Sequence, residues 1–377
     1  MRISLRRRFA AAALLLFGLA AAAAPVSAQA MADTGRSVVL IVTDGLRWQE
    51  LFGGADSTLN NKEYGGVEDT AALRRTYLVG GAEANRRALM PFMWGVIARD
   101  GQIYGNRRLG SDAVVTNGLK FSYPGYNEML TGRPDPRIDR NDYGPNPNLT
   151  VFGWLSSEPG FMSRVAAFGT WDVFADIFDR GFPLMTLRAG WELPFPGSTD
   201  PSRVLLDSLY ATTTRYWPGM PYDAFLQASV MEYLRTEHPR VLYLGFGETD
   251  EWAHSGKYDR YLATAHRVDG FIRDLWQAMQ AMPEYAGRTT FIITTDHGRG
   301  SGLEDWTDHG KDVEGAEHIW IAVMGPDIPG LGERRNVSFV TQAQVAATVA
   351  AAVGMDWVKV AGPAWTAGAL PVFGPGD

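Results

Sequence analysis

Two side chains that commonly bind metal ions stand next to each other in the stretch TTDHGRG, at Asp296 and His297. They directly follow the apolar run of residues 289–295, which is typical of a buried strand. At the corner where such a strand ends, a carboxylate and an imidazole can both turn toward one ion. The chain has six histidines and no cysteine, so histidines and carboxylates must hold any metal here.

Further possible ligands follow the ends of other predicted strands. Asp44 ends SVVLIVTD, and Asp250 and His254 follow VLYLGF, in a segment where the later SGKYDR favours a loop. His309 stands in DWTDHGKD, and His318 in EGAEHIW is its rival. Each has an ordinary explanation alone, since Asp-Gly pairs form turns and loop histidines are commonly solvated. Together, the six favoured residues provide two ions with three ligands each: Asp44, Asp250, His254, Asp296, His297 and His309.

The elements that must position these residues alternate along the chain. Short apolar runs rich in β-branched residues indicate buried strands, and longer segments with apolar residues at helical spacing indicate helices. This alternation predicts an α/β fold, a three-layer αβα sandwich with a mostly parallel central sheet, which binds ligands at the carboxyl ends of its strands. The strand runs are 37–43, 164–169, 240–246, 289–295 and 319–325, and the helical segments include 258–282 and 341–354.

The order of the motifs resembles that of the alkaline phosphatase superfamily, closest to its nucleotide pyrophosphatase/phosphodiesterase-like branch. The resemblance spans residues 37–355 and follows one order: strand-Asp-Gly, a hydroxyl nucleophile, Asp-x-x-x-His, Asp-His-Gly, then a late His-Gly before Gly-Pro-Asp. It implies two ligand sets, of which the first is Asp250, His254 and His309 and the second is Asp44, Asp296 and His297. His318 stays open as an alternative to His309, because both precede the same predicted strand.

The nucleophile implied by the resemblance is Ser122, in GLKFSYPGYNEMLTG, where it would also contact the metals. The start of a helix offers free amide groups and a partial positive charge for a phosphate, although a serine there can also be a plain helix cap. Asn141 is the first choice for an amide that holds a phosphoryl oxygen, with loop capping as the alternative. The family's usual Asn-His is replaced by Gly125-Tyr126, so substrate contacts are expected to differ.

The resemblance implies a hydrolase of phosphodiesters or phosphomonoesters that works through a phosphoserine on two divalent ions, zinc first and manganese as the alternative. Lys120 and Lys311 leave monoesters open, whereas an aromatic segment favours diesters. Sulfatases share the fold, but their Cys/Ser-x-Pro-x-Arg pattern meets Tyr126 at its last position, which argues against sulfate esters. A non-catalytic exported binding protein is the alternative from another class.

The length, the net charge and the first residues of the chain limit which classes of protein it can belong to. The 377-residue chain can bury a large core, and its net charge of −7 argues against binding nucleic-acid duplexes, which leaves a small phosphate ester as the expected partner. Residues 1–30 combine a basic start, a short apolar run and small residues. This pattern predicts a cleaved export signal, and hence a periplasmic or secreted protein with no membrane span in the mature chain.

Residues 31–377 are expected to form one domain with a cap. Residues 171–222 are aromatic, rich in Pro and Gly, and weakly periodic, which predicts an insertion above the sheet. An exposed aromatic there, such as Trp217, would line the substrate pocket, and packing of these aromatics against the sheet as core is the alternative.

Overall fold

An eight-stranded β-sheet lies at the centre of the part of the chain that the computed structural model describes, residues 35–181 and 184–374. Its strands are β1 (Ser37–Thr43), β2 (Gly101–Tyr104), β4 (Val165–Gly169), β5 (Thr186–Ala189), β6 (Val241–Phe246), β7 (Thr289–Thr294), β8 (Ile321–Met324) and β9 (Gly332–Glu333). Their order is β5-β4-β6-β1-β7-β8-β2-β9. Neighbours are parallel from β5 to β7, whereas β8 is antiparallel to both β7 and β2. A separate pair joins β3 (Ala113–Val114) to β10 (Val340–Thr341).

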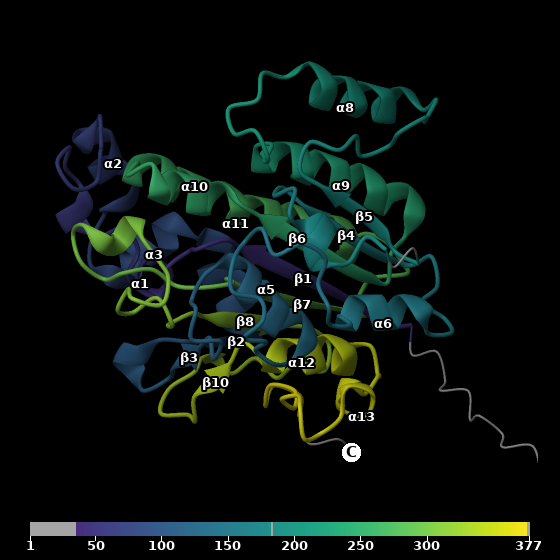
Figure 1. The fold of residues 1–377 in the computed structure, drawn as a ribbon. Coiled ribbons are helices and arrows are strands. Elements are labelled where there is room, and N and C mark those ends of the chain that lie inside the picture. The colour runs from purple at the N-terminus through teal and green to yellow at the C-terminus, as the bar shows by residue number, and fades with distance from the viewer. Residues whose placement is uncertain (1–34, 182–183, 375–377) are drawn as a thin grey trace, which may run out of the picture. The chain divides into compact units, whose positions relative to one another are not determined.

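Helices cover both faces of this sheet (Figure 1). They are α1 (Trp48–Gly53), α2 (Thr70–Tyr77), α3 (Ala82–Leu89), α4 (Ala98–Asp100), α5 (Ser122–Thr131), α6 (Val151–Ser157), α7 (Phe174–Ile177), α8 (Pro201–Thr212), α9 (Asp223–Glu237), α10 (Glu248–His254), α11 (Tyr258–Gln280), α12 (Gln344–Ala352) and α13 (Trp357–Ala361). Helices α9 and α11 lie on one side of the strands, and α5, α6 and α12 on the other.

Strand β1 shows why two layers of helices are needed. Its side chains alternate between the faces, so Val39 and Ile41 enter one hydrophobic core while Val38, Leu40 and Val42 enter the other. Both sides of the strand are buried, as is usual for a parallel strand covered by helices. The predicted α/β fold with a mostly parallel sheet is confirmed.

Three details of the prediction change. The run 319–325 does form a strand, β8, but it is antiparallel, and the short strands β2, β5 and β9 were not predicted. Asp250 and His254 lie on α10 and not in a loop, since the helix continues until Ser255 and Gly256 end it. These two residues therefore do share one helical face.

The segment 171–222 contains α7, β5 and α8. Because β5 pairs with β4, part of the segment predicted as a cap belongs to the central sheet. Helix α8 lies beyond α9, farther from the sheet (Figure 1). Trp217 is only 9 % exposed and packs in the hydrophobic core with Trp252 and Tyr222, so the pocket position is wrong for this residue and the core alternative is confirmed.

The predicted export signal, residues 1–30, lies outside the described residues and stays a prediction. The described residues belong to one compact unit of the chain. Among them, no helix combines the length and apolar character that crossing a membrane requires.

Candidate active site with two metal-ligand sets

Two carboxylates and one imidazole converge where β1 and β7 end. Asp44 follows β1 and Asp296 follows β7, and the two strands are parallel neighbours, so the side chains emerge at the same edge of the sheet. His297 Nε2 lies 3.3 Å from Asp44 Oδ1 and 3.4 Å from Asp296 Oδ2. Ligand atoms held ~2.0–2.1 Å from a tetrahedral ion are about 3.3 Å apart, so this spacing fits a metal site.

Each carboxylate has one oxygen engaged and one left over. Tyr126 donates its hydroxyl to Asp44 Oδ2 at 2.9 Å, and the Gly45 amide donates to Asp296 Oδ1 at 3.1 Å. The other oxygens, Asp44 Oδ1 and Asp296 Oδ2, are buried and accept no hydrogen bond from the described residues. They are the two oxygens that face His297 Nε2. Buried carboxylate oxygens require compensation, which a divalent cation would supply here.

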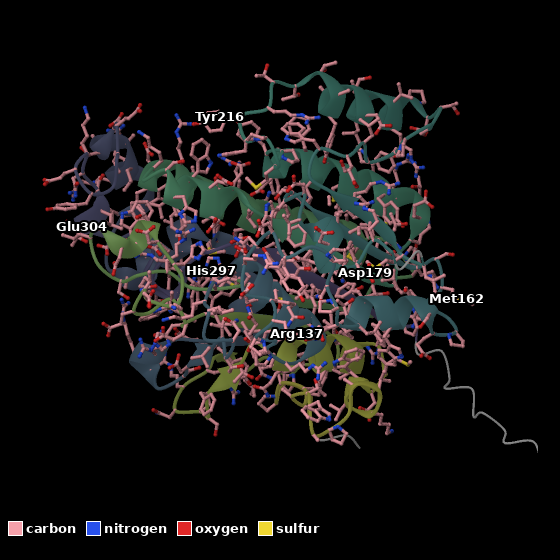
Figure 2. The ribbon with its side chains drawn as sticks, in the orientation of Figure 1. Arg137, Met162, Asp179, Tyr216, His297 and Glu304 are labelled. Atoms are coloured by element: carbon pink, nitrogen blue, oxygen red, sulfur yellow. The ribbon has the colours of Figure 1, made fainter. Side chains whose placement is uncertain are left out.

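His297 also presents the correct nitrogen. Its Nδ1 lies 2.9 Å from the carbonyl oxygen of Gly298, an arrangement in which Nδ1–H donates and Nε2 faces the carboxylates. The ring is fully buried in the interior of the molecule (Figure 2). With Nδ1 engaged in this way, Nε2 and the two carboxylate oxygens that face it are three ligand atoms available to one metal ion.

The charges of this first set are unbalanced without a cation. Burial raises the pKa of Asp296 to about 8, and the neighbouring carboxylate of Asp44 adds to the rise. Burial would lower the pKa of His297, but Asp296 and Asp44 raise it to about 9. Both shifts express the cost of placing two carboxylates together away from water. A divalent ion fits this group because it would stabilise both carboxylates in their charged form.

A second set lies beside the first. His254 Nε2 is 3.0 Å from His309 Nε2 and 3.2 Å from Asp250 Oδ2, while His309 Nε2 is 3.7 Å from Asp250 Oδ1. The atoms of Asp250, His309 and His297 also lie within 4.8 Å of one another. The rings of His297 and His309 stack with centroids 3.9 Å apart. The sequence placed His297 in one set alone, whereas in the structure it stands between the two.

Arg299 is a site residue that the sequence analysis missed. Its side chain is completely buried, and its guanidinium contacts the Asp250 carboxylate and the carbonyl oxygens of Gly45 and Thr307. It contacts Oδ1 of Asp250, the oxygen that also lies 3.7 Å from His309 Nε2. An arginine in a glycine-rich loop is usually solvated, so only the partners brought near by folding reveal this contact.

Ser122 begins helix α5 and faces the first ligand set. Its Oγ lies 3.4 Å from His297 Nε2, the same separation that this nitrogen has from the two carboxylates. The N-cap position belongs to Phe121, and no side-chain capping hydrogen bond is formed there. Ser122 therefore does not make the hydrogen bond that a plain helix cap would make.

Gly125 explains how the first turn of α5 comes so close to β7. A Cβ atom at this position would clash with the carbonyl oxygen of Asp296. The absence of a side chain thus brings the helix that carries Ser122 against the end of the strand that carries Asp296. This accounts for glycine at the first position of the unusual Gly125-Tyr126 pair.

Two other predicted residues have clear positions. Asn141 lines the same cavity as Ser122, and its Oδ1 accepts the backbone amide of Tyr123 at 3.1 Å, so it caps α5 while facing the site. His318 lies outside the described ligand groups, and its Nδ1 lies 3.1 Å from Asp112. The structure therefore brings His309, and not His318, to the other ligands.

A cavity of about 250 Å³ opens in front of these groups. Four of the six predicted metal ligands, together with Ser122 and Asn141, line this cavity. Apolar side chains and one further acid, Glu251, complete the lining. The residues that line the cavity are Asp44, Ser122, Asn141, Trp171, Phe174, Met220, Gly247, Asp250, Glu251, His254 and His309.

Comparisons with known proteins agree with a metal site. A family model described as the metalloenzyme superfamily matches residues 185–357, which include Asp250, Asp296 and His309. A 2,3-bisphosphoglycerate-independent phosphoglycerate mutase of Haloarcula marismortui is 25 % identical over 218 residues. That match covers 57 % of this chain, and the chain spans 38 % of the length of that curated relative.

Solved structures show the same fold at low identity. The lipoteichoic acid synthase of Listeria monocytogenes is 12 % identical, with a TM-score of 0.53, over 86 % of this chain and 73 % of that one. The phosphonate monoester hydrolase of Agrobacterium radiobacter is 13 % identical, with a TM-score of 0.51, over 85 % and 74 %. The family model thus matches part of the chain, and these solved structures show that the chain shares their fold.

Proposed function

We propose that the protein is a metal-dependent hydrolase of phosphate esters in which Ser122 is the nucleophile. One observation carries this proposal: Ser122 Oγ, Asp44 Oδ1 and Asp296 Oδ2 lie at nearly equal distances, 3.3–3.4 Å, from His297 Nε2. A hydroxyl is thus placed to serve as the fourth ligand of a set that is otherwise made of two carboxylates and an imidazole.

Two divalent ions fit the residues present. Asp44, Asp296 and His297, with Ser122, would hold one, and Asp250, His254 and His309 would hold the other. When bound, such ions lower the pKa of a coordinated hydroxyl or water and neutralise phosphate oxygens. Histidine and carboxylate ligands without thiolates suit zinc, and manganese accepts the same set.

The chain itself positions the reacting groups. Ser122 Oγ attacks phosphorus, the bond from phosphorus to the departing alcohol breaks, and the alcohol leaves with a proton. Water then cleaves the phosphoserine and restores the hydroxyl. The backbone amide of Ser122 and the side-chain amide group of Asn141 are placed to hold phosphoryl oxygens during both steps.

The lining of the cavity favours a diester over a monoester. A phosphomonoester carries two negative charges, yet no lysine or arginine is among the described residues that line the cavity. Lys120 is turned away, with its Nζ bonded to the Val313 carbonyl at 2.9 Å and to Glu317 at 3.3 Å. Trp171, Phe174 and Met220 instead offer an apolar surface for a second ester group.

A sulfate ester is the second candidate. It also carries one negative charge, and the apolar wall would accept its alcohol equally well. The position at which sulfatases carry arginine in the resembling motif is Tyr126, which is buried and neutral and bonds to Asp44. No cation is thereby offered to a sulfate at this point, which favours the phosphodiester.

The proposal is tested by assaying the zinc-loaded and the manganese-loaded protein against three esters of p-nitrophenol: the phosphate monoester, the methyl phosphodiester and the sulfate. We expect the highest kcat/KM for the diester. A higher value for the sulfate would establish the sulfatase alternative. If none is hydrolysed although two ions are bound per chain, the exported binding protein becomes the better description.

We also propose that the protein is exported, acts on a small ester, and forms one catalytic domain in which residues 171–222 contribute to the substrate pocket. The composition of residues 1–30 supports the first point. The position of Trp171, Phe174 and Met220 in the cavity wall supports the last.

A further inference from the structure

One carboxylate in the cavity has no role in the proposed chemistry. Asp250, Glu251 and His254 on α10 all line the cavity, together with Gly247, which precedes the helix. Asp250 and His254 belong to the second ligand set, but Glu251 belongs to neither. Its half-buried carboxylate makes no hydrogen bond or ion pair with another described residue, and it lies near enough to His254 and Asp44 for their charges to act on it.

Aromatic and thioether groups share the cavity with Glu251. Trp171 and Phe174 meet edge to face with ring centroids 6.2 Å apart, and Phe174 meets Tyr126 in the same way at 4.8 Å. Met220 is 3 % exposed and lines the cavity beside them. The part of the cavity lining that lies outside the ligand sets is therefore electron-rich as well as apolar, and it carries the carboxylate of Glu251.

We propose that these lining residues recognise an alkylammonium group on the substrate, with Glu251 as the charge partner and Trp171 as the ring that the cation faces. This inference rests on the proposed function, because it identifies the second ester group of the same substrate. The substrate is then a zwitterionic phosphodiester, in which the phosphate lies at Ser122 and the cation at Glu251.

Charge and size both lead to this class of substrate. An anionic extension would be repelled by Glu251, and a neutral alkyl group would leave that carboxylate partly desolvated without a partner. A cation gains both the carboxylate and the faces of the aromatic rings, which attract alkylammonium groups in proteins. The cavity volume of about 250 Å³ is below the ~300–1,000 Å³ of sites for drug-sized ligands, so a short chain fits better than a nucleotide.

The test compares two diesters of equal shape. In p-nitrophenyl phosphorylcholine the second ester group ends in trimethylammonium, and in neohexyl p-nitrophenyl phosphate it ends in a neutral tert-butyl group. We expect kcat/KM to be about tenfold or more higher for the choline ester. In Glu251→Gln this ratio should fall below about threefold, because the amide removes the charge but keeps the shape. Glu83→Gln is the matched control, since Glu83 is 70 % exposed on α3, outside the cavity, and the ratio should stay as in the native protein.

A binding measurement accompanies the assay. Calorimetry on metal-loaded Ser122→Ala should show tighter binding of phosphocholine than of neohexyl phosphate, and Glu251→Gln in the same background should abolish the difference. Equal values for the two compounds, in either assay, would overturn the inference. Failure of the native protein to cleave the methyl diester would instead count against the proposed function, and the calorimetry would still decide for or against the ammonium site.

Discussion

The hydroxyl of Tyr126 donates a hydrogen bond to Oδ2 of Asp44 at 2.9 Å, one turn along the helix that begins at Ser122. Burial raises the pKa of Tyr126 well above its ordinary value, and the nearby carboxylates of Asp296 and Asp44 add to the rise, so the hydroxyl keeps its proton. The bond fixes the carboxylate with Oδ1 turned toward His297. Tyr126 thereby orients the Asp44 carboxylate of the first ligand set.

Tyr126→Phe is expected to weaken metal binding at the first ligand set by about 10–100-fold, as loss of a partner that orients a ligand typically does. Titration of the metal-free protein with zinc, in competition with a chelator, measures this change. Tyr123→Phe is the control: this tyrosine is on the same helix and equally buried, but its hydroxyl donates to the Gly144 carbonyl. An unchanged zinc affinity in Tyr126→Phe would show that Asp44 needs no such partner.

Ser122→Ala is expected to abolish steady-state turnover while the midpoint of thermal unfolding stays nearly unchanged. The hydroxyl makes no capping hydrogen bond, so the loss of about 1 kcal/mol that usually follows removal of a cap should not occur. Kinetics and thermal unfolding on the same metal-loaded sample measure both effects. Turnover close to the native value would refute a serine nucleophile.

His309→Ala is expected to reduce the bound metal from two ions per chain to about one, because three ligands rather than two are needed to hold the second ion tightly. His318→Ala should keep both ions, since His318 pairs with Asp112 outside the ligand groups. Elemental analysis after gel filtration gives the metal content of each variant. The opposite pattern would move the second site to His318.

Trp217→Ala is expected to lower the free energy of unfolding by about 3–5 kcal/mol, the usual cost of removing a large buried aromatic side chain. The ring is 9 % exposed and lies 4.9 Å from the rings of both Tyr216 and Trp252. Trp365→Ala, at a position that is 69 % exposed, should cost much less. Urea unfolding of both variants tests the contrast, and a similar loss in the two would contradict the core position of Trp217.

Asp269 should make stability depend on pH. Burial raises its pKa from 3.8 to about 6, although it accepts the amides of Phe92 and Met93 at 2.7 and 2.8 Å. Between pH 4 and pH 6 the folded chain therefore keeps a proton that the unfolded chain has released. The free energy of unfolding falls as the pH rises through that window and loses nothing more from this group above it.

Asp269→Asn removes this dependence, because the amide does not titrate. The free energy of unfolding of the variant, relative to that of the native protein, should rise by on the order of 3 kcal/mol between pH 4 and pH 7. Urea unfolding of the metal-free proteins at several pH values measures the difference. Asp274→Asn, which is on the same helix but 48 % exposed, serves as the control. A difference that does not change with pH would show that Asp269 titrates alike in both states.

The sequence revealed the centre of the fold well and its edges poorly. Strands β1, β6 and β7 are long, apolar on both sides and bounded by clear breaks, so their residues identify them. Strand β5 has four residues, including a charged Arg188, and becomes a strand only because β4 lies beside it. The antiparallel direction of β8 was also hidden, since the periodicity of a strand is the same in both directions.

The site shows the same division. Asp44, Asp296 and His297 are recognisable because their chemistry is unusual at the end of a buried strand. Tyr126, Arg299 and Glu251 are not, because each has an ordinary residue type and acts through a neighbour that is distant in sequence. Their partners or surroundings become known only when the helices and loops have packed around the strand ends.

Gly125 has a consequence for how the site can adapt. Because the backbone of α5 approaches the carbonyl of Asp296 closely, the spacing between Ser122 and the carboxylates is set by main-chain contact and leaves little room for adjustment. Trp171, Met220 and Glu251 line the cavity with side chains, which can change by single substitutions without moving any backbone. Under the proposed function, inherited variation can therefore alter which ester is accepted while Ser122 and the ligand sets keep their spacing.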